Sequence, residues 1–205
     1  MRVLAIDCAT EACSAALFED GTLLDGRWEV LGRGHAERLV PMIAELPGKG
    51  RAARIVVSLG PGSFTGVRIG LAAARALGLA WRAEVLGYPT LALVAAMARA
   101  QHPGPITVCM TAGHGEWFVQ DFAADGTTER KLASHGPELA AQRAAHALVA
   151  GSQAKALVAV RGSGTALPLL PDASSLPLLP DGILDSNLAP IYGREPDAKL
   201  PEARN

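Results

Sequence analysis

The sequence has almost no net charge and few aromatic residues. The first shortage excludes tight binding of nucleic acid by charge alone, and the second excludes a core built on aromatic side chains. The 19 Lys and Arg residues are balanced by 20 Asp and Glu residues, which leaves a formal net charge of −1. Such a chain has no basic excess with which to bind nucleic acid tightly through charge alone. Aromatic residues make up only 4% of the 205 residues, so the core must consist mainly of Ala, Leu and Val. The length suits one large domain or two small lobes.

Long apolar runs and paired cysteines are also lacking. No run approaches the ~20 residues that cross a membrane, and Asp7 interrupts the short apolar stretch near the N-terminus, unlike in a signal peptide. The three cysteines, Cys8, Cys13 and Cys109, are an odd and sparse set, which favours reduced thiols over a disulfide framework. We therefore expect a soluble, cytoplasmic α/β protein with no membrane partner.

Apolar patterning predicts alternating strands and helices in the first half of the chain. The Asp20-Gly21 pair is a strong hairpin signal between two of the strands. The helices follow from apolar residues at helical spacing, and the strands from short apolar runs. In chain order we expect strands 3–6, 14–18 and 22–30, helix 35–46, strand 54–59, helix 65–80, strand 85–88 and helix 90–101.

The same order of elements begins again after residue 101. We expect strands 106–110, 116–122 and 127–133, helix 137–150 and strand 156–160, followed by loop with short pieces of structure. The distance from the end of the first strand to the hairpin turn is 13 residues in the first half (7 to 20) and 14 in the second (111 to 125). The alternative is a coincidence of common α/β order. A duplication predicts two lobes around a cleft, the plan of the actin-like ATPases.

Two segments in the first half carry residues that suit a nucleotide. Asp7 ends the first strand and Thr10 follows it, so a carboxylate and a hydroxyl lie where α/β folds bind ligands. The glycine-rich loop 60–66, which contains Ser63, joins a strand to a helix N-terminus, where free N–H groups attract anions. The competing interpretations are that Asp7 and Thr10 only bond their own turn, and that Ser63 or Thr65 only caps the helix.

The helix after this loop has a stripe of small residues. Gly66, Gly70, Ala74 and Gly78 recur at every fourth position, which allows another helix to approach closely. Each interior glycine costs about 1 kcal/mol relative to alanine, so the helix needs a close-packed neighbour. That neighbour is either internal, with helix 35–46 of the same chain as an example, or another subunit.

Metal and nucleophile motifs are not found in the sequence. The five histidines have no metal-ligand spacing, and no GxSxG or similar motif occurs. We therefore expect no metal site and no catalytic residues.

Together these motifs resemble the TsaB (YeaZ) family. The matching segments are 1–17 (MRVLAIDCATEACSAAL), 35–43 (HAERLVPMI), 60–72 (GPGSFTGVRIGLA) and 87–95 (GYPTLALVA), with weaker matches at 114–118 (HGEWF) and 189–194 (APIYGR). The resemblance implies an α/β protein of the actin-like ATPase (ASKHA, ribonuclease H-like) fold with two duplicated lobes, the second shortened. The lobes are expected at 1–101 and 102–194, with a disordered tail at 195–205.

The resemblance further implies a non-catalytic scaffold. Such a subunit pairs with the catalytic relative TsaD, works with the ATPase TsaE, and forms a homodimer when alone. Together they place threonylcarbamoyl on N6 of adenosine 37 in tRNAs that read ANN codons, and tRNA is reached through the complex. TsaD holds metal through histidines that have no counterpart after strand 85–88 here.

Helices 35–46 and 65–80 are the expected dimerisation surface. The candidate contacts on these helices are His35, Leu39, Met42, Arg68, Gly70, Leu71, Ala74 and Arg75.

Two departures from the family bear on nucleotide chemistry and on the second lobe. Thr111, the counterpart of Asp7, stands where many relatives carry an acid, so ATP or ADP with Mg²⁺ is expected to bind only weakly, at Asp7, Thr10 and Ser63. Residues 184–189 leave no room for a helix that relatives place there. The rival functions are an independent ATPase and, with less support, a peptidase.

Overall fold

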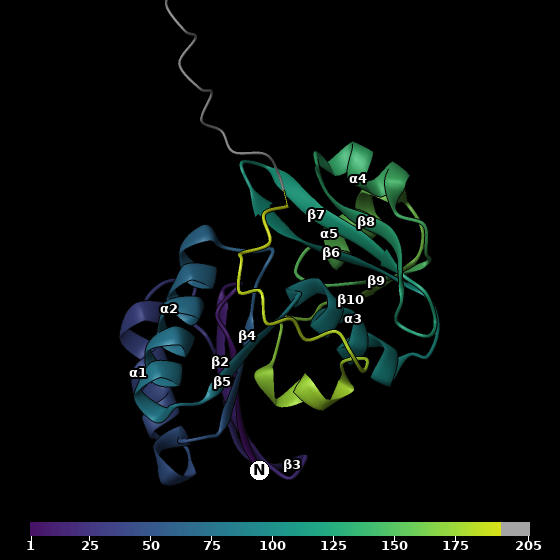
Figure 1. The fold of residues 1–205 in the computed structure, drawn as a ribbon. Coiled ribbons are helices and arrows are strands. Elements are labelled where there is room, and N and C mark those ends of the chain that lie inside the picture. The colour runs from purple at the N-terminus through teal and green to yellow at the C-terminus, as the bar shows by residue number, and fades with distance from the viewer. Residues whose placement is uncertain (194–205) are drawn as a thin grey trace, which may run out of the picture.

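Residues 1–193 are described by the computed structural model, and they form two five-stranded sheets with helices on their faces (Figure 1). The predicted tail 195–205 lies outside the described residues. The elements of the first half are β1 (Arg2–Asp7), β2 (Ala12–Glu19), β3 (Thr22–Val30), α1 (His35–Ala44), the 3-10 helix η1 (Pro47–Gly50), β4 (Arg54–Ser58), α2 (Phe64–Trp81), β5 (Glu84–Tyr88) and α3 (Thr90–Gln101). Those of the second half are β6 (Ile106–Gly113), β7 (Glu116–Phe122), β8 (Thr128–His135), α4 (Pro137–Arg143), β9 (Leu148–Ala150), α5 (Ala154–Arg161), β10 (Thr165–Leu167) and the 3-10 helix η2 (Ala173–Leu178).

The two sheets have the same topology, which confirms the predicted duplication. The first sheet has the order β3-β2-β1-β4-β5, and the second, read from its β8 edge, has the order β8-β7-β6-β9-β10. In both, the first strand is antiparallel to the second and parallel to the fourth. The chain is therefore an α/β protein of two equivalent lobes.

The predicted boundaries in the second half were wrong in one region. The expected helix 137–150 ends at Arg143, and residues 148–150 form strand β9, while the expected strand 156–160 is part of helix α5. The stretch is rich in alanine, which favours helix throughout. Pairing of Val149 and Ala150 with β6 in the buried sheet overrides that preference, and the burial of Ala154 and Leu157 on one face holds α5 as a helix.

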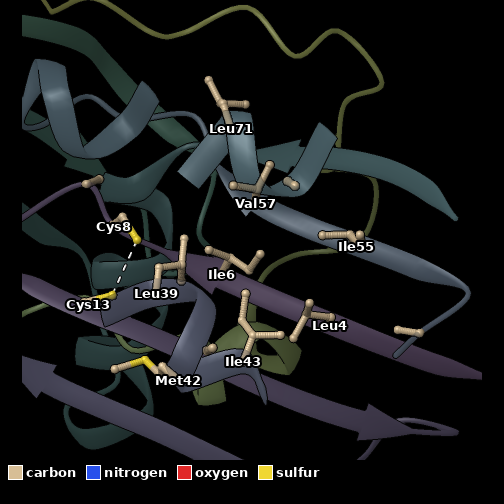
Figure 2. Close-up of a cluster of buried hydrophobic side chains, with 14 of the residues drawn as sticks. Leu4, Ile6, Cys8, Cys13, Leu39, Met42, Ile43, Ile55, Val57 and Leu71 are labelled. Atoms are coloured by element: carbon tan, nitrogen blue, oxygen red, sulfur yellow. Dashed lines mark hydrogen bonds between the residues drawn. The ribbon is translucent and has the colours of Figure 1, made fainter. Parts of the chain in front are cut away.

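Alternate residues of β1 face two different layers. Leu4 and Ile6 pack with α1 and α2 on one face of the first sheet (Figure 2), whereas Ala5 faces η2 on the other. Helix α3 lies between the two sheets, with Leu93 against the first and Leu91 against the second. Helices α4 and α5 cover the far face of the second sheet. The pairs α1–α2 and α4–α5 are thus the outermost layers of the molecule.

The chain returns to the first lobe after β10. Ala173 of η2 packs on Ala5 and Ala16 of the first sheet. The segment Asp185–Gly193, named the strap here, then pairs Asp185 with Gly87 of β5 and donates from Ile191 N–H to the Leu59 carbonyl at 2.8 Å. As predicted, no helix lies between residues 184 and 189. Packing therefore crosses the predicted division at residue 101, because α3 and the strap each contact the other half.

Candidate functional site

A cleft of about 730 Å³ lies between the two lobes. Its first-lobe wall is the turn after β1 and the loop that opens α2, and its second-lobe wall is the end of β6 with the loop before α5. The strap closes one side of it through Ile191 and Tyr192. Thr10 and Ser63, both predicted to bind nucleotide, line this cleft.

Asp7 lies beneath the cleft and does not line it, which corrects the prediction for this residue. Its carboxylate accepts hydrogen bonds from Ala9 N–H at 2.9 Å and from the Tyr88 hydroxyl at 2.8 Å, and the side chain is buried. Burial raises the pKa of Asp7 to about 6, and the two donors oppose that rise. The carboxylate is therefore engaged by its own fold rather than presented to a metal–nucleotide.

The glycine-rich loop is shaped by close packing against the turn after β1. A Cβ on Gly62 would lie 1.9 Å from the Ala9 carbonyl oxygen, and one on Gly66 would lie 2.0 Å from the Cys8 carbonyl oxygen. Only glycine allows this approach. The Ser63 hydroxyl accepts from Gly66 N–H at 3.2 Å as the N-cap of α2, and Thr10 Oγ1 accepts from Ala12 N–H at 3.2 Å. Within the chain, Thr10 therefore bonds its own turn and Ser63 caps the helix, as the competing interpretation of these two hydroxyls expected.

The second-lobe wall presents hydroxyl and amide groups. Thr111 N–H donates to Ser152 Oγ at 3.1 Å, and Gln153 Nε2 donates to Thr111 Oγ1 at 2.8 Å. Among the described residues that line the cleft, Glu11 is the carboxylate and Arg68 the guanidinium. The described residues contain no cluster of three His, Cys, Asp or Glu side chains suited to a metal ion.

Two aromatic residues at the mouth of the cleft were missed by the sequence analysis. The Arg68 guanidinium lies 3.5 Å from the centre of the Phe64 ring and donates to the Tyr192 hydroxyl at 3.0 Å. The rings of Phe64 and Tyr192 are 6.2 Å apart. The spacing of Phe64 and Arg68, one helical turn, could have indicated their contact. No local signal could have placed Tyr192, because it arrives on the strap.

The predicted interface contacts separate into buried and exposed groups. Five of them lie in the core of the first lobe beneath α1 and α2, namely Leu39, Met42, Gly70, Leu71 and Ala74. His35 is also buried, with Nε2 3.3 Å from the Ala12 carbonyl oxygen. The prediction of a contacting role for these six residues needs correction, because they face the chain's own sheet. Arg68 and Arg75 are exposed, and Arg75 donates to the Leu188 carbonyl of the strap at 3.0 Å.

The small-residue stripe of α2 therefore meets its own sheet. A Cβ on Gly70 would make ordinary contacts with Val57 and Cys8, at 3.5 and 3.6 Å. The neighbour of the stripe is therefore internal, as one of the two alternatives held, but it is the first sheet and the turn after β1 rather than helix α1. At the C-terminal end of the stripe, a Cβ on Gly78 would meet Val85 of β5. The surface that remains free is the opposite side of the two helices, named the outer helix face here. Its exposed apolar residues are Ala36, Val40, Pro41, Ala44, Ala72, Ala76 and Leu79, and α1 also exposes Glu37.

Two lobes of one topology around a shared cleft define the actin-like α/β class, and solved structures agree. YeaZ from Pseudomonas aeruginosa superposes with a TM-score of 0.79 at 29% identity, over 93% of this chain and 99% of that chain. The ethanolamine utilization protein EutJ from Carboxydothermus hydrogenoformans has a TM-score of 0.52 at 11% identity, over 88% of this chain and 90% of that one, which is a likeness of fold alone. No helix of the described residues 1–193 has the length and apolar character needed to span a membrane.

Sequence comparison narrows the class to a family. Residues 29–160, more than half of the chain, match the family described as "TsaD: tRNA N6-adenosine threonylcarbamoyltransferase". The tRNA threonylcarbamoyladenosine biosynthesis protein TsaB of Escherichia coli K12 is 38% identical over 131 residues, which are 61% of this chain and 56% of that protein. TsaB of Haemophilus influenzae is 38% identical over 105 residues, which are 49% and 43%. The chain thus spans about half the length of these relatives, and it belongs to this family as one of its TsaB (YeaZ) members.

Proposed function

We propose that this chain is a non-catalytic, cytoplasmic scaffold subunit that pairs with TsaD. In this role it supports the transfer of threonylcarbamoyl to N6 of adenosine 37 in tRNAs that read ANN codons, with TsaE as the associated ATPase. In the absence of TsaD it forms a homodimer. The observation that carries the proposal is the outer helix face, an exposed apolar surface on the two helices that the resemblance associates with pairing.

The outer helix face has the composition of a docking surface. Leu79 is 84% exposed and Val40 is 56% exposed, although both are large apolar side chains. The alanines around them are small enough to let the helices of a partner approach closely. Helices α1 and α2 contact each other and cover the same face of the first sheet, so their exposed sides form one surface (Figure 1). Arg68 and Arg75 border it and offer positive charge to carboxylates on a partner.

The cleft supports a scaffold better than an independent ATPase. In phosphoryl transfer, carboxylates hold the metal ions that neutralise the phosphates. Here Asp7 is bonded to Tyr88 beneath the cleft, and the opposite wall offers Thr111 and Ser152. The volume of the cleft, and its lining by Arg68 and the start of α2, are the features that favour nucleotide.

Placing a charge on the outer helix face should prevent pairing. Leu79→Arg puts a guanidinium at the most exposed apolar position, and its desolvation against an apolar partner should weaken both the homodimer and the TsaD complex at least tenfold. Val160→Arg is the matched control, because Val160 is 47% exposed on α5, in the equivalent outermost layer of the second lobe. Co-purification with TsaD and size-exclusion chromatography measure the effect, and thermal melting confirms the fold. A folded Leu79→Arg variant that pairs normally would refute this placement.

Nucleotide binding by the isolated chain should be weak. We propose that ATP or ADP with Mg²⁺ enters the cleft against Thr10 and Ser63, where Glu11 is the one carboxylate among the described lining residues. Isothermal titration should give a Kd weaker than micromolar, which is less than about 8 kcal/mol of binding free energy. Tighter binding, or steady phosphate release from Mg-ATP without a partner, would favour the independent ATPase instead.

A further inference from the structure

We propose that Cys8 and Cys13 form a reversible disulfide that locks the loop on the first-lobe wall of the cleft. Their sulfur atoms lie 3.6 Å apart as free thiols, and both side chains are buried (Figure 2). Nothing in the proposed scaffold role uses this pair. The inference stands on their geometry and is independent of the proposed function.

The backbone already holds the two cysteines in a position to be joined. Asp7 of β1 is paired with Ser14 of β2, and continuing this register by one residue places Cys8 opposite Cys13. Directly opposed residues of antiparallel strands have Cα atoms about 4.5–5.5 Å apart. Disulfides span Cα separations of about 4.4–6.8 Å. Rotation of the two side chains is therefore enough to close the bond without moving the strands.

The environments of the thiols give them different roles. The hydrogen bond with Cys8 lowers the pKa of Cys13, and the same contact, together with burial, raises the pKa of Cys8. Cys13 is thus the nucleophile and Cys8 the resolving thiol. Cys109 lies in the second lobe, where burial raises its pKa to about 12, so it serves as an internal reference that should stay reduced.

The oxidant is hydrogen peroxide, which is small and uncharged and can therefore reach the buried pair during local opening. The Cys13 thiolate attacks one peroxide oxygen, the O–O bond breaks, and the leaving hydroxide takes a proton to become water. This leaves a sulfenic acid on Cys13. Cys8 then loses its proton and attacks the Cys13 sulfur, the S–O bond breaks, and a second water departs. Two thiols lose two electrons and one hydrogen peroxide becomes two waters.

The Cys8–Cys13 disulfide would join the two ends of a loop that faces the cleft. Residues 9–12 connect the two cysteines, and Thr10 and Glu11 among them line the cleft. The same loop meets the opening of α2, because the backbone of Gly62 touches the Ala9 carbonyl and that of Gly66 touches the Cys8 carbonyl. A covalent link between the loop ends would therefore restrict one wall of the cleft at its contact with α2.

The test is thiol counting on the 205-residue chain before and after hydrogen peroxide treatment. Alkylation under denaturing conditions, read by mass spectrometry, should label all three cysteines in the reduced protein and only Cys109 after oxidation, with full recovery after dithiothreitol. Cys109→Ser should still form the link, and Cys13→Ala should not. Hydrogen exchange at residues 9–12 should slow on oxidation and recover on reduction.

Three outcomes would overturn the proposal. They are persistence of three alkylatable thiols, a link between chains on a non-reducing gel, and irreversible oxidation of Cys8 or Cys13 without a disulfide. A disulfide that leaves exchange at residues 9–12 unchanged would refute the locking of the cleft wall. The wild-type measurement decides the question even if Cys13→Ala does not fold.

Discussion

Gly66→Ala is expected to destabilise the protein by about 2–3 kcal/mol or more. The added Cβ would lie 2.0 Å from the Cys8 carbonyl oxygen, and because that atom belongs to the backbone, either the turn after β1 or the start of α2 must shift. Helix propensity alone predicts the opposite, a gain of up to about 1 kcal/mol. Chemical denaturation of the two proteins measures the difference in unfolding free energy.

Gly70→Ala, one turn further along α2, is the matched control. Its Cβ would meet Val57 and Cys8 at 3.5 and 3.6 Å, which are ordinary contacts, so the propensity gain should be retained. Opposite signs for the two substitutions are expected. Equal effects at both positions would show that the contact with the Cys8 carbonyl does not determine the packing of the loop. Gly70→Leu, by contrast, should destabilise the monomer itself, because the position faces the core.

Asp7→Asn is expected to change the pH dependence of stability by about 2–3 kcal/mol between pH 4 and pH 8. The pKa of Asp7 rises from 3.8 to about 6 on folding. The folded state therefore keeps a proton that the unfolded state releases, and stability is lost as pH rises from about 4 to about 6. The full difference between 3.8 and about 6 corresponds to about 3 kcal/mol, of which a part is already lost below pH 4. Asparagine has no proton to lose, so this loss should vanish.

The measurement is the unfolding free energy of both proteins at several pH values. Relative to wild type, Asp7→Asn should gain stability as pH rises through this window and show a constant difference above it. Asp181→Asn, at an exposed position in the second half of the chain, is the control and should not show this change. A difference between Asp7→Asn and wild type that does not vary with pH would contradict the assignment of the raised pKa to Asp7.

The order of strands and helices along the first half, and the three strands that open the second half, could be predicted because short apolar runs and Asp-Gly turns are local signals. The Asp20-Gly21 turn does join β2 to β3. The boundaries between helix and strand in residues 137–161 could not be predicted correctly, because an alanine-rich sequence suits both a helix and a buried strand. Only the pairing of β9 with β6 determines which residues form the strand. The face of α2 was also ambiguous. Ala72 and Ala76 are exposed while Gly70 and Ala74 are buried, and all four are small residues.

The site was predicted in part for similar reasons. Thr10 and Ser63 reach the cleft because each follows a strand at the edge where the two lobes meet. Asp7 was expected beside them, but a residue at the last position of a strand can turn either toward the cleft or into the sheet. Tyr88, which lies far along the chain and holds it beneath the sheet edge, decides this. The contact of Arg68 with Tyr192 depends on the strap, which no spacing in the sequence predicts.

The strap also has a consequence for the order of folding during synthesis. Chains leave the ribosome N-terminus first, and domains commonly fold in that order. Here Ala173 of η2 covers Ala5 and Ala16, and Asp185 of the strap pairs with the edge of β5. Until these residues emerge, the part of the first sheet beneath η2 and the β5 edge remain uncovered while the whole second lobe is being made, although α3 already packs on Val56 and Tyr88 of the same face. The first lobe, although translated first, is therefore the last to complete its packing, and its uncovered edge is the part of the nascent chain most open to pairing with the wrong strand.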